Sequence, residues 1–171
     1  MPLPANAFAL DDAVVYRGKP MRVAGRLTLE GASGQTSVRY HLSDGAGAPI
    51  FIEHAGDRYA LLRPLPPAAE PQTAGNTVLV GEERYTLVGV RKLKMVEALG
   101  LISGATPKAA LLVSGVFEGA MGTLMRELTP GEGRQVYYLV KPLAAGELLS
   151  ARAHAGARAA ERRAAGERDD D

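Results

Sequence analysis

The chain lacks cysteine and tryptophan, and it has only three phenylalanines among 171 residues. The absence of cysteine excludes disulfides, thiolate nucleophiles and cysteine-ligated zinc, and it fits a reducing compartment. The net charge of +1 lacks the basic surplus typical of domains that bind nucleic acid through phosphate contacts. Exposed tyrosines beside arginine on one sheet would be needed for single-stranded nucleic acid, and tyrosine more often packs strands. We therefore expect no nucleic-acid partner.

Long apolar runs are also missing. The most apolar stretch, residues 101–125, is interrupted by Pro107, Lys108 and Glu118, so we expect no membrane-spanning helix. The first twelve residues, MPLPANAFALDD, have neither a basic segment nor a long apolar run, and they do not resemble a secretory signal. These features predict a cytoplasmic location.

Alternation of apolar and polar residues dominates the first half of the chain. In residues 21–30, Met21, Val23, Leu27 and Leu29 share one parity, which is typical of a strand with one buried face. Similar short segments follow at residues 38–42, 49–54 and 58–64, and glycine-rich turns separate them. This half is predicted to be a meander of antiparallel strands.

The second half repeats the pattern of the first. RYALLRPL at residues 58–65 resembles VYYLVKPL at 136–143, and VVYRGKPMRVAG at 14–25 resembles VLVGEERYTLVG at 78–89. The alignment pairs Gly18 with Gly81, Gly25 with Gly89, Ile50-Phe51-Ile52-Glu53 with Leu124-Met125-Arg126-Glu127, and Tyr59, Leu61, Arg63 and Pro64 with Tyr137, Leu139, Lys141 and Pro142. The preserved order indicates two copies of one small β-unit, with an internal duplication as the favoured explanation and convergence of strand patterns as the alternative.

We accordingly predict a mainly β fold of two related small antiparallel β-units, barrel- or sandwich-like, with a short C-terminal helix. Residues 1–67 form the first unit, 68–76 a Pro- and Ala-rich linker unable to pack as a strand, and 77–150 the second unit. Residues 151–171 are rich in Ala, Arg and Glu without an apolar stripe, which predicts a solvated helical or disordered tail.

The second unit contains an inserted apolar segment. Leu93, Val96 and Leu99 stand at near-helical spacing, so the pattern in residues 91–101 favours a helical turn. Residues 105–119 are compatible with either a helix or strands.

A few histidine and acidic residues are the candidates for chemistry. His41 and His54 have no neighbour at a recognised metal-ligand spacing, so they are expected to be surface residues on a polar face. If a pocket lies between the two β-units, then His41, His54, Asp57 and Arg58 are the polar groups to examine there. Phosphate-loop and nucleophile-elbow motifs are absent from the sequence. We expect neither a metal nor a cofactor, and a non-enzymatic role is favoured over an enzymatic one.

The apolar segment 110–128 is the first candidate for a partner surface. Its large apolar side chains would be adhesive if exposed, and would line the core if buried. The candidates are Val116, Phe117, Met121, Leu124 and Met125.

The strand and turn pattern resembles domain-of-unknown-function family 4178 over residues 10–150. The matching segments are Val23-Ala24-Gly25, Tyr40-His41-Leu42, Ser43-Asp44-Gly45 and Ile50-Phe51-Ile52. The resemblance implies a bacterial β-rich accessory protein without an established activity. Genes of that family often lie beside membrane-stress proteins similar to phage shock protein A and beside membrane channels.

The resulting hypothesis is a non-enzymatic binding or adaptor protein of the bacterial cytoplasm, with a protein partner linked to a membrane-associated or membrane-stress complex. The alternative is a small-ligand binder or an enzyme with a pocket between the two β-units. Whether the chain forms a homo-oligomer is left open.

Overall fold

The computed structural model describes residues 3–100, 111–130 and 133–166. Within these ranges the chain is mainly β, as expected, and it ends in one α-helix. The strands are β1 (Ala13–Tyr16), β2 (Lys19–Gly31), β3 (Thr36–Ser43), β4 (Ile50–Ala55), β5 (Arg58–Pro64), β6 (Gln72–Ala74), β7 (Thr77–Val80), β8 (Glu83–Gly100), β9 (Leu111–Gly119), β10 (Gly122–Thr129), β11 (Arg134–Pro142) and β12 (Leu148–Ser150). The helices are η1 (Pro67–Ala69), of 3-10 type, and α1 (Ala151–Gly166).

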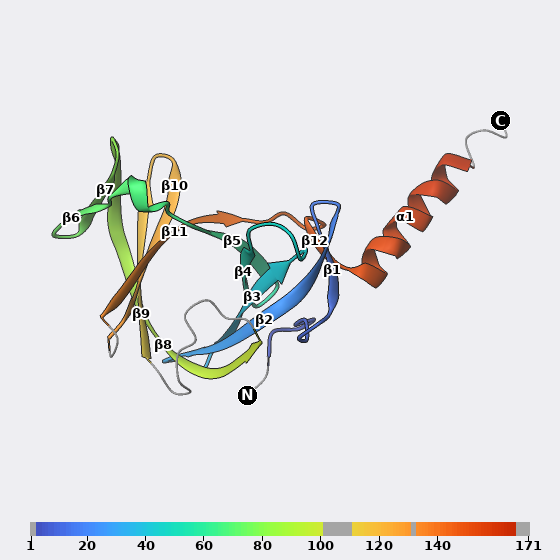
Figure 1. The fold of residues 1–171 in the computed structure, drawn as a ribbon, viewed down its shortest axis with the longest axis horizontal. Coiled ribbons are helices and arrows are strands. Elements are labelled where there is room, and N and C mark those ends of the chain that lie inside the picture. The colour runs from blue at the N-terminus through green and yellow to red at the C-terminus, as the bar shows by residue number, and fades with distance from the viewer. Residues whose placement is uncertain (1–2, 101–110, 131–132, 167–171) are drawn as a thin grey trace.

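Eight of these strands close into an antiparallel barrel (Figure 1). Their order is β2-β3-β4-β5-β11-β10-β9-β8, and β8 returns to pair with β2 from Gly25 opposite Gly100 to Gly31 opposite Leu93. Closure satisfies the backbone groups that an open sheet would leave along its edges. The barrel takes four strands from each half of the chain, so neither half closes it alone.

Each half contributes a four-stranded meander, and the two meanders run in opposite directions around this barrel, so that β5 pairs with β11 and β2 pairs with β8. β1 forms a hairpin with β2, as β7 does with β8, and the two turns contain Gly18 and Gly81 with φ of +78° and +62°. β12 ends the second half but pairs with β1 of the first, whereas β6 follows the first half and pairs with β7 of the second. The positions aligned in the sequence therefore occupy corresponding strands, and a common ancestry of the halves stays a prediction.

A β-bulge in each half divides the apolar residues between two faces of the sheet. The register of β2 shifts between Val23 and Gly25, and that of β8 shifts between Leu87 and Gly89. A bulge inserts one residue and reverses the side on which the later residues point. Met21 and Val23 consequently pack outside the barrel, while Leu27 and Leu29 of the same strand pack inside it. The apolar residues of 21–30, predicted to share one face of a strand, thus belong to two separate apolar clusters.

Three apolar clusters result. One covers the outer face of β2–β5 beneath the N-terminal segment, β1 and β12, and includes Phe8, Tyr40 and Ile52. Another covers the outer face of the second half beneath β7, with Val78 and Phe117 among its members. The cluster inside the barrel lies at the β2–β8 junction and consists of Leu27, Leu29, Leu93, Met95 and Leu112.

The helical spacing in residues 91–101 proved misleading, because residues 91–100 belong to the long strand β8. A register shift opposite Thr28 and Leu29 leaves Val96 as an extra residue between Met95 and Glu97. This bulge interrupts the period of two and produces the apparent helical spacing. Residues 111–119, for which the pattern left helix and strand open, form strand β9. Residues 101–110 lie outside the described residues.

The predicted linker also contains a strand, contrary to expectation. Residues 72–74 of the 68–76 stretch form β6, which pairs with β7 at the end of the sheet. Its three residues are exposed. Pro71 precedes the strand, where its missing N–H removes no ladder hydrogen bond.

The tail forms helix α1, which projects away from the barrel in Figure 1. The hydroxyl of Ser150 accepts a hydrogen bond from the N–H of Ala153 at 3.1 Å, as an N-cap residue does. None of the helical residues is buried. The expectation of a solvated helix is met over residues 151–166.

Candidate functional site

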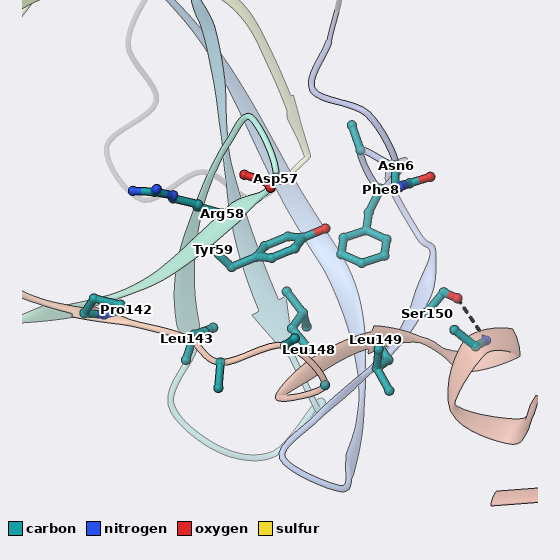
Figure 2. Close-up of a pocket in the computed structure, with 15 residues that line it drawn as sticks. Asn6, Phe8, Asp57, Arg58, Tyr59, Pro142, Leu143, Leu148, Leu149 and Ser150 are labelled. Atoms are coloured by element: carbon teal, nitrogen blue, oxygen red, sulfur yellow. Dashed lines mark hydrogen bonds between the residues drawn. The ribbon is translucent and has the colours of Figure 1, made fainter. Parts of the chain in front are cut away.

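A groove lies where the N-terminal segment, the β4–β5 turn and the chain after β11 meet (Figure 2). Its volume is about 910 Å³, and it lies between residues of the first half and residues of the second. The lining residues are Asn6, Ala7, Phe8, Asp57, Arg58, Tyr59, Pro142, Leu143, Ala144, Ala145, Gly146, Leu148, Leu149, Ser150 and Ala153.

Aromatic rings form one wall of this groove. Figure 2 shows the rings of Tyr59 and Phe8 facing each other, with centroids 6.3 Å apart and planes inclined by 28°. Behind Tyr59 lies the imidazole of His54, stacked on it at 4.1 Å. The wall is therefore supported from within by packed rings, which fixes its shape.

A hydrogen bond joins the N-terminal segment to Tyr40, and Tyr40 in turn contacts His54 behind this wall. The backbone N–H of Phe8 donates to the hydroxyl of Tyr40 at 3.0 Å, and that hydroxyl lies 3.1 Å from Nδ1 of His54. Burial raises the pKa of Tyr40 to about 12, although its bond to Phe8 acts in the opposite direction. Burial also lowers the pKa of His54, and a hydrogen bond to the backbone of Gly56 only partly opposes this. In the neutral tautomer protonated at Nε2, Nδ1 of His54 accepts a hydrogen bond from the Tyr40 hydroxyl.

The opposite wall is the chain between β11 and α1. The N–H of Leu143 donates to the carbonyl of Tyr59 at 2.9 Å, which ties this wall to the first half. Glu147 accepts from the N–H of Ala144 at 2.5 Å and from Nε of Arg17 at 3.0 Å. The bond from Ala144, more than the one from Arg17, holds the pKa of Glu147 below its usual value. The carboxylate thus orders the turn that carries Leu148.

The four polar residues proposed for a pocket do not converge on one point. Asp57 and Arg58 line the groove at its rim, and Figure 2 shows the Arg58 side chain extending away from Tyr59. His54 is only 1% exposed and lies behind Tyr59, so the expectation of a surface histidine is wrong for this residue. His41 follows Tyr40 on the other face of β3 and packs edge-on against Phe51, with ring centroids at 5.2 Å. The sheet separates the two histidines.

The predicted partner surface is mostly interior. Phe117, Leu124 and Met125 are 1%, 0% and 2% exposed, and Val116 lines a cavity inside the barrel. Met121 alone of the five is well exposed, at 75%, in the turn between β9 and β10. One face of these strands points into the barrel, and β7 covers the other. The sequence pattern did not reveal that both faces are covered.

An ion network inside the barrel was not foreseen. Arg39 of β3 donates from Nε to Glu53 at 3.1 Å and from Nη1 to Glu127 at 2.7 Å. Burial opposes the charge of Arg39, but Glu127 and Glu53 more than offset this and raise its pKa. Arg91 of β8 approaches the other oxygen of Glu53 at 3.6 Å. The one sequence signal for this network was the alignment of Glu53 with Glu127, because equivalent positions in the two halves of a barrel both point inward.

A cavity of about 310 Å³ adjoins this network within the barrel. It is lined by Glu53, Leu62, Arg91, Val116, Thr123, Met125 and Val140. Arg91 also lines a hollow of about 730 Å³ that includes the turn residues Ala32 and Ser33. Arg91 thus borders both the barrel interior and the outside.

Metal-ligating residues do not gather anywhere in the described ranges, where no group of three or more His, Asp or Glu residues could hold an ion. In the same ranges, the helices are too short or too polar to cross a membrane.

Comparison with known proteins adds no relative. No protein-family model matches the chain, and no curated protein or solved structure gives a significant match. The resemblance to family 4178 stays a prediction.

Proposed function

We propose that the chain is a non-enzymatic binding protein that holds a small, mostly apolar molecule in the groove between its two halves. The observation that carries this proposal is the groove itself, with a volume of about 910 Å³ and a lining of two aromatic rings and several leucines. Ligand pockets commonly have volumes of about 300–1,000 Å³ and are lined by apolar side chains with a few polar groups.

The polar groups at the rim favour a ligand with one polar end. Asp57 and Arg58 are exposed beside an apolar interior of Phe8, Tyr59 and Leu148. The hydroxyl of Ser150 already caps α1, so among the lining residues it is not poised as a nucleophile. A binding role needs nothing more than this apolar interior and polar rim.

The adaptor role at a bacterial membrane complex rests on the resemblance to family 4178 and stays a prediction. Four of its five surface candidates are interior or line the barrel cavity. The small-ligand hypothesis, in contrast, gains a groove at the predicted place between the halves.

Fluorescence of the neutral probe N-phenyl-1-naphthylamine tests the groove. We expect enhanced emission with the wild-type chain, and loss of the enhancement in Ala153→Trp, whose indole would fill the groove. Ala155→Trp is the matched control, because residue 155 is also exposed on α1 but does not line the groove. Weak emission with the wild-type chain, or equal emission in all three proteins, would contradict the proposal.

A further inference from the structure

The interior of the barrel is a second, separate place where polar groups face a cavity. Strand pairing sets Arg91 opposite Ser114 and Ser114 opposite Glu127, so these three side chains point to the same side of the sheet. The same side carries Arg39 and Glu53, which are paired across β3 and β4. The sheet itself separates this site from the groove on its outer face.

Unpaired polar atoms of both kinds lie at this site, because Nη2 of Arg39, the hydroxyl of Ser114 and Oε2 of Glu127 have no hydrogen-bond partner among the described residues. Arg39 is 8% exposed, and its Nη2 is buried without a hydrogen-bond partner although Nε and Nη1 are both engaged. Ser114 is fully buried, and its hydroxyl also has no partner. A buried polar atom left unpaired costs about 1–3 kcal/mol, so the protein's own groups do not saturate the hydrogen-bonding capacity of this site.

Arg91 adds further donors. Its guanidinium has five N–H groups. Its recorded neighbours are an oxygen of Glu53 at 3.6 Å and the sulfur of Met125 at 3.7 Å, and thioether sulfur is a weak acceptor. The Arg91 side chain is 43% exposed, so this residue is accessible from outside the barrel.

The ion pairs leave Arg91 the less committed of the two arginines. Arg39 lies between Glu53 and Glu127, and Arg91 reaches Glu53 only at long range. The closer ion pairs are therefore those of Arg39, while Arg91 retains most of its hydrogen-bonding capacity. Guanidinium recognises a carboxylate through two parallel N–H bonds better than it recognises a neutral group.

Apart from Glu53, Arg91 and Thr123, the cavity wall is apolar. Leu62, Val116, Met125 and Val140 line it, and its volume of about 310 Å³ suits a short aliphatic chain rather than a large ring system. Eight-stranded barrels are wide enough to enclose one small ligand. The geometry points to a barrel-interior site for a small aliphatic monocarboxylate, with the carboxylate on Arg91 and the hydrocarbon against these four side chains.

Three probes with the same tail test the assignment: octanoate, 1-octanol and octylamine. The readout is the NMR signal of ¹³C-labelled methionine methyl groups in the full chain. Met125 lines the cavity, whereas Met21 packs outside the barrel and reports on ligands bound elsewhere. We expect octanoate to shift Met125 and leave Met21 unchanged, with octanol and octylamine binding about tenfold more weakly or worse.

Arg91→Gln should bring the affinity for octanoate down to that for octanol. Lys92→Gln is the matched control, because it removes the same charge from the next residue of β8, which is exposed and points to the opposite face. An unchanged Met95 signal shows that the barrel interior is intact in both variants.

Three results would overturn the inference: no shift of Met125 with any probe, equal affinity for all three probes, or identical behaviour of Arg91→Gln and Lys92→Gln. Each leaves the groove proposal untouched, because that site is probed by the Ala153→Trp variant. Conversely, failure of the naphthylamine experiment does not affect the response of Met125 to octanoate.

Discussion

Replacing Glu127 with Gln should destabilise the protein far more than the same change at an exposed glutamate. The side chains of Glu127 and Arg39 are 11% and 10% exposed, and the carboxylate lies 2.7 Å from Nη1. In the variant the Arg39 charge stays buried, with Glu53 as its remaining carboxylate neighbour among the described residues. A neutral amide offers only one acceptor oxygen in place of the lost charge.

The magnitude follows from the burial of both partners. Removing one member of a buried ion pair costs about 3–5 kcal/mol of unfolding free energy, because the other charge is left uncompensated. Since Arg39 keeps its bond to Glu53 at 3.1 Å, we expect a loss near the lower limit, about 3 kcal/mol. Glu118→Gln, at an exposed position near the end of β9, should change the stability by no more than about 0.5 kcal/mol.

Urea unfolding followed by far-ultraviolet circular dichroism measures this difference. With a slope of about 1–3 kcal/mol per molar urea, the midpoint of Glu127→Gln should fall by roughly 1–3 M while the slope stays the same. The triple variant Arg39→Met, Glu53→Leu and Glu127→Leu should lose less than Glu127→Gln, because it leaves no unpaired charge on Arg39. A midpoint for Glu127→Gln equal to that of Glu118→Gln would refute the reasoning.

Three further predictions concern packing and titration. Burial lowers the pKa of His54 from the ordinary histidine value of 6.5, so as the pH falls through this range the unfolded chain binds more protons than the folded chain. The free energy of unfolding should therefore fall as the pH drops from 7.5 to 5.5. Urea midpoints at both pH values should show this fall, and His54→Gln should make it smaller. Gly100→Ala should cost about 3 kcal/mol, since φ is +68° and a Cβ would lie 2.3 Å from the Ala24 carbonyl oxygen, whereas Gly89→Ala meets no atom within 4 Å and should cost less than about 1 kcal/mol; thermal unfolding compares the two. Because Phe117 is buried in the core, Phe117→Ala should lower the free energy of unfolding in urea by about 3–5 kcal/mol. A negligible loss would contradict the burial of this side chain.

The strands and turns could be predicted from the sequence because they depend on neighbours along the chain. Alternation in residues 38–42 and 58–64 marked β3 and β5, and Gly18 and Gly81 marked turns that need positive φ. The tail was predicted as a solvated helix because it combines helix-forming residues with no apolar stripe.

Closure of the barrel could not be predicted in the same way. It depends on the pairing of β2 with β8, whose partners Gly25 and Gly100 are far apart in sequence. The bulge after Val23 further hides which parity points inward, since an extra residue reverses the faces. An alternating strand such as β3 reveals that it has an apolar and a polar face, and does not reveal that its polar face will be enclosed.

Enclosure of that polar face explains why the ion network and the cavity occur together. In an isolated half, Arg39 and Glu53 would lie on the solvated side of a four-stranded sheet, and exposed ion pairs contribute little. When the second half closes the barrel, it turns Glu127 and Arg91 toward the same interior, where each charge must find a partner. The aligned glutamates then share Arg39, and Arg91 is left at the opening with donors to spare. The proposed site for an acidic ligand thus rests on Arg91, which the two glutamates engage less closely than they engage Arg39.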